Sequence, residues 1–123
     1  HEFESKSTVP PGLIDPVYEY GRREGGSITG GYVYRGSELK ESVGLYFFND
    51  YMSGRTWSLN TNGDTASVKR IALDTPLAVS SFGETPMGEL LVCGFKSAYG
   101  RKGKIYRLVS VEVDSSDKES NMR

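Results

Sequence analysis

The feature that most constrains this chain is a series of short apolar runs, each beginning at or beside a glycine. The clearest run follows Gly30 and Gly31, where tyrosine, valine and tyrosine lead to Arg35 and Gly36. Glycine permits backbone conformations that other residues avoid, and the aromatic and β-branched residues after it suit a pleated sheet. The same arrangement returns at 44–50, 54–59, 88–93 and 103–108. The series predicts a fold built from short β-strands.

The spacing of the runs predicts about eight strands, each starting roughly 10 to 13 residues after the last. The expected strands cover 17–20, 27–36, 45–49, 55–59, 67–73, 77–82, 89–93 and 104–113. Fifteen glycines and eight tyrosines disfavour a helical bundle, so the predicted class is all-β. The spacing fits either a sandwich or two four-stranded propeller blades, and periodicity does not choose between them.

Composition predicts where the ordered part of the chain begins and ends. Residues 1–16 are polar and contain four residues that resist regular structure, Pro10, Pro11, Gly12 and Pro16, which predicts an arm or linker. Residues 17–113 hold the expected strands, and the charged stretch 114–123 is expected to be a flexible tail. Within the ordered part, Asn62-Gly63 is the strongest turn signal, and Gly54 is expected to adopt a special dihedral in a hairpin loop.

The net charge, the length of the apolar runs and the cysteine count also narrow the classes of partner. A net charge of −1 and a pI near 5.9 give no general attraction to nucleic acid. No apolar run approaches the roughly 20 residues that a membrane-spanning helix needs. The lone cysteine, Cys93, has no internal disulfide partner. Its apolar surroundings favour a buried, inert thiol over a reactive one.

Several segments together resemble one protein family. They are PVYEY (16–20), SITGGYVYRG (27–36), GLYFFNDYMSGRTWSL (44–59), SSFGE (80–84), GEL (88–90) and KIYRL (104–108). In order and spacing they resemble the C-terminal part of the glucose/sorbosone dehydrogenase family, which includes soluble quinoprotein sugar dehydrogenases and Hedgehog-interacting-protein-like proteins. The resemblance implies about two four-stranded blades of a six-bladed β-propeller, completed by other chains or by copies of this one.

The resemblance also bears on cofactor chemistry. Family members that bind pyrroloquinoline quinone carry two arginines, one residue apart, at the positions matching Ala78 and Ser80. Losing two charge-assisted contacts would cost about 1.5–3 kcal/mol each, so no cofactor is predicted. The family's catalytic histidine lies in blades outside this chain, and His1, at the chain end, is not expected to replace it.

We therefore expect a non-catalytic, extracellular or secreted binding or structural module. Its partners would be other propeller chains or copies of itself, and a carbohydrate or an extracellular protein is a further candidate. The alternative is a fragment of a soluble aldose or glucose dehydrogenase that depends on pyrroloquinoline quinone, and calcium enters only with that alternative. A superficial calcium loop at 60–64 lacks its distal glutamate, because Ile71 stands there, and no metal site is predicted.

Three residues are candidates for a ligand or channel site: Arg35, Arg55 and Trp57. The two arginines follow glycine-marked strand ends and could face a central channel. The alternative is that they pair with acids such as Asp50 or bond to loops; Asp50 itself is expected to brace its own turn. Trp57 could stack on a sugar ring, whereas burial between blades is the usual place of such an aromatic.

A second candidate site is a basic loop, made of Lys96, Arg101, Lys102 and Lys104. It could bind a sulfated glycan or an acidic partner, and the alternative is a solvated hairpin tip. The apolar runs predict in addition that Leu45, Phe47, Trp57 and Leu90 are buried, several of them against strands of another chain.

Overall fold

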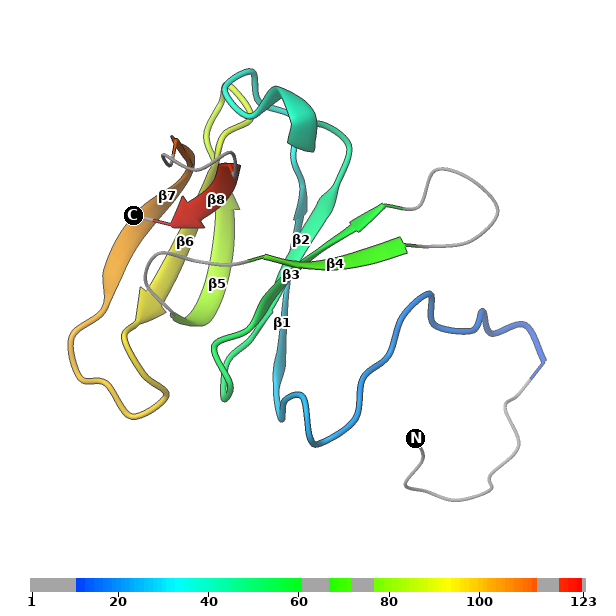
Figure 1. The fold of residues 1–123 in the computed structure, drawn as a ribbon. Helices are drawn as coiled ribbons and strands as arrows, with labels where there is room; N and C mark the ends of the chain where they lie inside the picture. The colour runs from blue at the N-terminus through cyan, green and yellow to red at the C-terminus, as the bar shows by residue number, and fades with distance from the viewer. Residues whose placement is uncertain (1–10, 61–66, 72–76, 113–117, 123) are drawn as a thin grey trace.

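The structure is a computed structural model that describes residues 11–60, 67–71, 77–112 and 118–122. Its strands form two antiparallel sheets, with the orders β1-β2-β3-β4 (sheet 1) and β5-β6-β7-β8 (sheet 2) (Figure 1). The strands are β1 Ile28–Val33, β2 Tyr46–Asp50, β3 Thr56–Asn60, β4 Ser67–Ile71, β5 Ala78–Glu84, β6 Leu90–Phe95, β7 Lys104–Glu112 and β8 Lys118–Met122; a 3-10 turn, η1, spans Lys40–Ser42. The all-β prediction is confirmed.

The structure corrects two of the predicted elements. Residues 17–20 form no strand, because Tyr18 and Tyr20 pack their rings on a face of sheet 1 instead of adding to its edge. The stretch 118–122, predicted as flexible tail, is β8 and pairs with β7 from Leu108 to Glu112. β6 pairs only with the first half of β7, so the second half offers free backbone groups that a polar strand can use.

Some of the predictions lie outside the described residues. These are the first ten residues of the arm, the Asn62-Gly63 turn and the rest of the 114–123 tail. Within the described part, residues 11–16 form no helix or strand. Gly54 has a φ of 77°, which confirms its special dihedral.

The glycine pair at the start of β1 permits a close approach of two strands. The register between β1 and β2 shifts between Thr29 and Tyr32, which marks a β-bulge at Gly30 and Gly31. A Cβ on Gly31 would overlap the carbonyl oxygen of Phe47, so no other residue fits this position without moving β2. The sequence feature that signalled a backbone constraint is therefore a bulge packed against β2.

Sheet 1 is covered on both faces by its own chain. Phe47 faces sheet 2 in the larger core, together with Tyr34, Leu77, Val79, Leu90, Val92 and Leu108. The next residue, Phe48, faces the other way and joins Trp57 and Leu59 in a second cluster beneath Tyr18 and Tyr20. The ring centroids of Tyr20 and Trp57 are 4.9 Å apart, and those of Phe48 and Trp57 are 5.2 Å apart.

This cover changes the prediction about burial. Phe47, Trp57 and Leu90 are 1%, 4% and 0% exposed in the single chain, whereas Leu45 is half-buried. The prediction that strands of another chain bury several of them is wrong for Phe47, Trp57 and Leu90. Tyr18 and Tyr20 supply the apolar surface that covers Trp57, and sheet 2 supplies it for Phe47.

The two sheets repeat one another and stack in the same sense. β5 contacts β1 and β2. Gly44 and Gly88 both have a φ of 90° and stand two residues before β2 and β6, so Phe47 corresponds to Leu91 and Phe48 to Val92. Phe47 lies on the side of sheet 1 that faces sheet 2, whereas Val92 lies on the side of sheet 2 that faces sheet 1. Phe47 marks the face through which sheet 1 packs on sheet 2. Its counterpart Leu91 marks the same face of sheet 2, which points away from sheet 1.

A buried amide joins the sheets. Asn49, fully buried in β2, donates through Nδ2 to the Thr56 hydroxyl at 2.9 Å and to the Leu77 carbonyl at 3.3 Å. Its Oδ1 accepts from the Val79 backbone N–H at 3.2 Å. Because both ends of the amide are satisfied, Asn49 fixes how sheet 1 lies against β5.

Candidate functional site

A buried carboxylate organises one end of the molecule, where the β1–β2 connection meets the β5–β6 turn. Glu89 is 6% exposed and accepts from the Tyr34 hydroxyl at 2.7 Å. It also accepts from the backbone N–H groups of Ser37 at 3.0 Å and Glu38 at 3.3 Å. The Tyr34 oxygen in turn accepts from the Leu39 N–H at 2.8 Å. The network holds the 35–39 loop against the β5–β6 turn.

These contacts set the protonation of the pair. Burial alone would raise the pKa of Glu89, but the hydrogen bonds from Tyr34, Ser37 and Glu38 and the charge of Arg107 outweigh it and lower that pKa. Burial and the bond to Glu89 raise the pKa of Tyr34 above its ordinary value. At neutral pH the pair is therefore a carboxylate and a neutral phenol.

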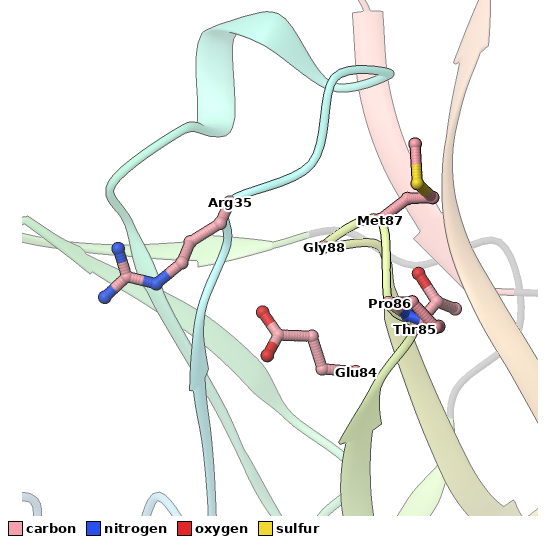
Figure 2. A pocket seen from close by; sticks show the side chains of 6 residues that line it. All are labelled: Arg35, Glu84, Thr85, Pro86, Met87 and Gly88. Carbon is pink, nitrogen blue, oxygen red and sulfur yellow. The ribbon is translucent and has the colours of Figure 1, made fainter.

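An open depression of about 560 Å³ lies beside this network (Figure 2). Figure 2 shows Arg35 on the side of β1 and the other lining residues on the side of the β5–β6 turn: Glu84, Thr85, Pro86, Met87 and Gly88. Arg35 and Glu84 are exposed, as is Met87. The Thr85 hydroxyl is occupied, because it accepts from the Glu89 N–H at 3.0 Å.

Gly88 lets the two walls of the depression touch. Its φ is 90°, and a Cβ there would lie 2.8 Å from the carbonyl carbon and oxygen of Arg35. Such a distance is too short for two carbon atoms, so the close approach of the turn to the Arg35 backbone requires glycine. The position of Arg35 is thus set by backbone packing, while its guanidinium stays exposed.

The depression brings together groups that a ligand could contact. One guanidinium, one carboxylate and the apolar surface of Met87 and Pro86 can hold a small polar or charged group. Among the residues that line it, no nucleophile is paired with a base. Among the described residues, no three His, Cys, Asp or Glu side chains gather as metal ligands would.

The three predicted ligand or channel residues lie in different places. Arg35 lines the depression. Arg55 lies at the opposite end of the sheets and donates to the carbonyl oxygens of Glu24 at 2.9 Å and Arg23 at 3.3 Å. Trp57 is buried under Tyr20. Arg55 and Trp57 therefore follow the alternatives weighed for them, loop bonding and burial.

Ala78 and Ser80, the two positions that the expected resemblance compares with quinone-binding arginines, carry no charge. Ala78 is 2% exposed within β5. Ser80 is exposed, and its hydroxyl donates to the Cys93 carbonyl at 3.1 Å. Neither side chain can supply a positive charge, so the residues present here do not reproduce that part of a quinone site.

Asp50 braces its own turn, as predicted, and also bonds to residues outside that turn. Its carboxylate accepts from the Ser53 N–H at 2.9 Å within its own turn, from the Ser27 N–H at 2.8 Å and from the Tyr20 hydroxyl at 2.8 Å. Burial works to raise the pKa of Asp50, and the hydrogen bonds led by that from Ser53 lower it overall. The carboxylate ties its own turn to both ends of the 20–27 segment, at the end of the molecule opposite the depression.

The remaining predicted residues are at the surface. Lys96, Arg101, Lys102 and Lys104 are all exposed around the β6–β7 hairpin tip. Cys93 is half-buried, not buried, because it lies on the face of sheet 2 that points away from the core, which no described strand covers. His1 lies outside the described residues.

Sequence reasoning missed Glu89, Tyr34 and Asn49 as organising residues. A glutamate directly before the apolar run 90–93, and directly after a glycine, was the available signal for Glu89. Because its donors lie 51 to 55 residues away in the chain, spacing could not identify them.

No family model matches the chain. No solved structure matches it. Within the described residues, no helix has the length and apolar character needed to cross a membrane.

Proposed function

We propose that this chain is a non-catalytic binding or structural module that supplies two blades of a larger β-propeller. Further copies of the chain, or other propeller chains, cover the faces that it leaves bare. The resemblance to the glucose/sorbosone dehydrogenase family supports the propeller and an extracellular setting. Assembly is then the first activity of the module, and the depression at Arg35 is a site that the assembled ring presents.

The observation that carries the proposal is the outer face of sheet 2, which no described element covers. In sheet 1 the corresponding face carries Phe47, which packs against sheet 2. In sheet 2 it carries the half-buried Leu91, Cys93 and Val109 and the 71% exposed Ile105. Arg107, the cross-strand partner of Leu91, lies on the same face and pairs with Glu38. Exposed apolar surface of this kind marks an interface. When each sheet packs the same face against the next sheet, the last sheet in the row is left with that face bare. A closed ring of blades covers it, because the last sheet then packs against the first.

The expected result is that the wild-type chain forms an assembly larger than 13.6 kDa at micromolar concentration. Ile105→Asp places a charge on the uncovered face and should dissociate the assembly without unfolding the chain, since Ile105 is already exposed. Size-exclusion chromatography with light scattering measures the mass. Val43→Asp, at a 57% exposed position in the β1–β2 connection, is the matched control and should leave the mass unchanged.

A stable, soluble wild-type monomer would contradict the proposal that the chain assembles. Equal masses for Ile105→Asp and Val43→Asp would contradict the proposal that this face of sheet 2 is the interface. The same samples test the non-catalytic part of the proposal. With pyrroloquinoline quinone, calcium and an aldose present, we expect no reduction of a redox dye. Robust turnover would favour the sugar dehydrogenase alternative.

A further inference from the structure

Three loops are held side by side at the end of the molecule opposite the depression. Arg55 in the 51–55 loop bonds to carbonyl oxygens of the 21–27 loop, and the Tyr51 N–H bonds to the Ser27 carbonyl at 2.7 Å. The Tyr51 hydroxyl donates to the Ala98 carbonyl, 3.2 Å away in the 96–104 hairpin. Because the 51–55 loop contacts both of the others, the three loops form one surface, the lower end in Figure 1.

This loop surface is strongly basic. It presents exposed Arg23, Lys96, Arg101, Lys102 and Lys104 and the half-exposed Arg55. Arg55 bonds to neutral carbonyl oxygens, so its charge is not cancelled. The loops contain one acidic residue, Glu24, while Asp50 lies buried beneath them with its oxygens occupied.

The opposite end carries more acids than cations. Its cations are Arg35, Lys40 and Arg107, of which Arg107 pairs with Glu38 at 3.1 Å. Its acids are Glu38, Glu41, Glu84 and the buried Glu89. The net charge of −1 therefore conceals a separation of charge along the strands. Such a field can orient and attract a polyanion at one end only.

We propose that the loop surface formed by 21–27, 51–55 and 96–104 binds a sulfated polysaccharide. Its cations are spread over three loops, which suits a chain carrying several discrete anionic groups. Arginine and lysine together provide the bidentate and point-charge contacts that sulfate oxygens accept. The proposal goes beyond assembly and does not require it, because a single chain holds all three loops.

Nucleic acid and anionic membrane fit the surface less well. Single-stranded nucleic acid is held by aromatic side chains on which successive bases stack, and Tyr99 is the one strongly exposed ring on this hairpin. An anionic bilayer is normally met by an amphipathic helix or lipid anchor, and the three described loops contain no helix. The surface thus offers charge contacts without a base-stacking platform or a membrane-inserting element.

The test uses the full-length chain and heparin as the probe, with affinity measured by fluorescence anisotropy at several salt concentrations. Removing two hairpin cations, in Lys102→Ala/Lys104→Ala, should weaken binding about tenfold and reduce the salt slope by about 2. Arg23→Ala should weaken it about threefold, because this residue is in a different loop of the same surface. Lys40→Ala/Lys69→Ala removes the same charge elsewhere and should change affinity less than about twofold.

All of these side chains are exposed, so each variant should keep the wild-type circular dichroism and melting temperature. Equal losses of heparin affinity in the two double variants would show that only net charge matters. That result would contradict binding at the loop surface. Binding of duplex DNA or phosphatidylserine vesicles as tight as that of heparin would overturn the choice of a sulfated polysaccharide. Light scattering on the same variants separates the two proposals, because loss of heparin binding with unchanged mass leaves assembly intact.

Discussion

Replacing Glu89 with alanine should lower the free energy of unfolding by about 3–5 kcal/mol. The substitution leaves the buried Tyr34 hydroxyl and the partly buried N–H groups of Ser37 and Glu38 without their acceptor. Urea unfolding followed by circular dichroism measures the loss. The matched control is Glu84→Ala, which removes an exposed carboxylate at the rim of the depression and should stay within about 0.5 kcal/mol of wild type.

The stabilisation from Glu89 should depend on pH in a defined direction. The pKa of Glu89 is lower in the folded chain than its ordinary value, so the unfolded chain takes up its proton first as the pH falls. The contribution is therefore complete above the ordinary carboxyl pKa of about 4.3 and is lost as the pH falls through the lower folded-state pKa. The difference in stability between wild type and Glu89→Ala should shrink over this range. A difference that stays constant from neutral to acidic pH would contradict the role of the ionised carboxylate.

Replacing Trp57 with alanine should cost about 3–5 kcal/mol, because it empties the centre of the cluster between Phe48 and Tyr20. Trp57→Glu should cost more and leave the chain unfolded or aggregated, since the charge would be buried without a partner. Thermal unfolding followed by far-ultraviolet circular dichroism, which does not depend on the missing tryptophan, measures both variants.

The control for this prediction is Tyr99→Ala. It removes an aromatic ring that is 84% exposed, so its effect should stay within about 0.5 kcal/mol. If Trp57→Ala were as stable as Tyr99→Ala, the tyrosine-covered cluster would not contribute to the stability of sheet 1. The prediction also separates cover by the chain's own tyrosines from cover by a partner, because Trp57→Ala should lose stability at every protein concentration.

The candidate site could be predicted from the sequence only in part. Arg35 was identified because it follows a glycine-marked strand, and it does line the depression. Its neighbours Glu84 and Met87 were not identified, because they reach Arg35 through the contact of β5 with β1 and not through proximity in the chain. The basic hairpin was visible as a run of charges, whereas its union with Arg23 and Arg55 depends on bonds between loops.

The sequence by itself determined the all-β class, most of the strands and the special places of Gly31 and Gly54, because alternation and glycine act through local backbone sterics. Tertiary structure decided which faces are covered. Propensity predicts a strand at Tyr18 and Tyr20, yet their rings pack on Phe48 and Trp57 instead of adding a strand to the edge of sheet 1. Glu89 and Asn49 likewise acquire their roles from donors and acceptors far away in the chain, which pair only once the two sheets are stacked.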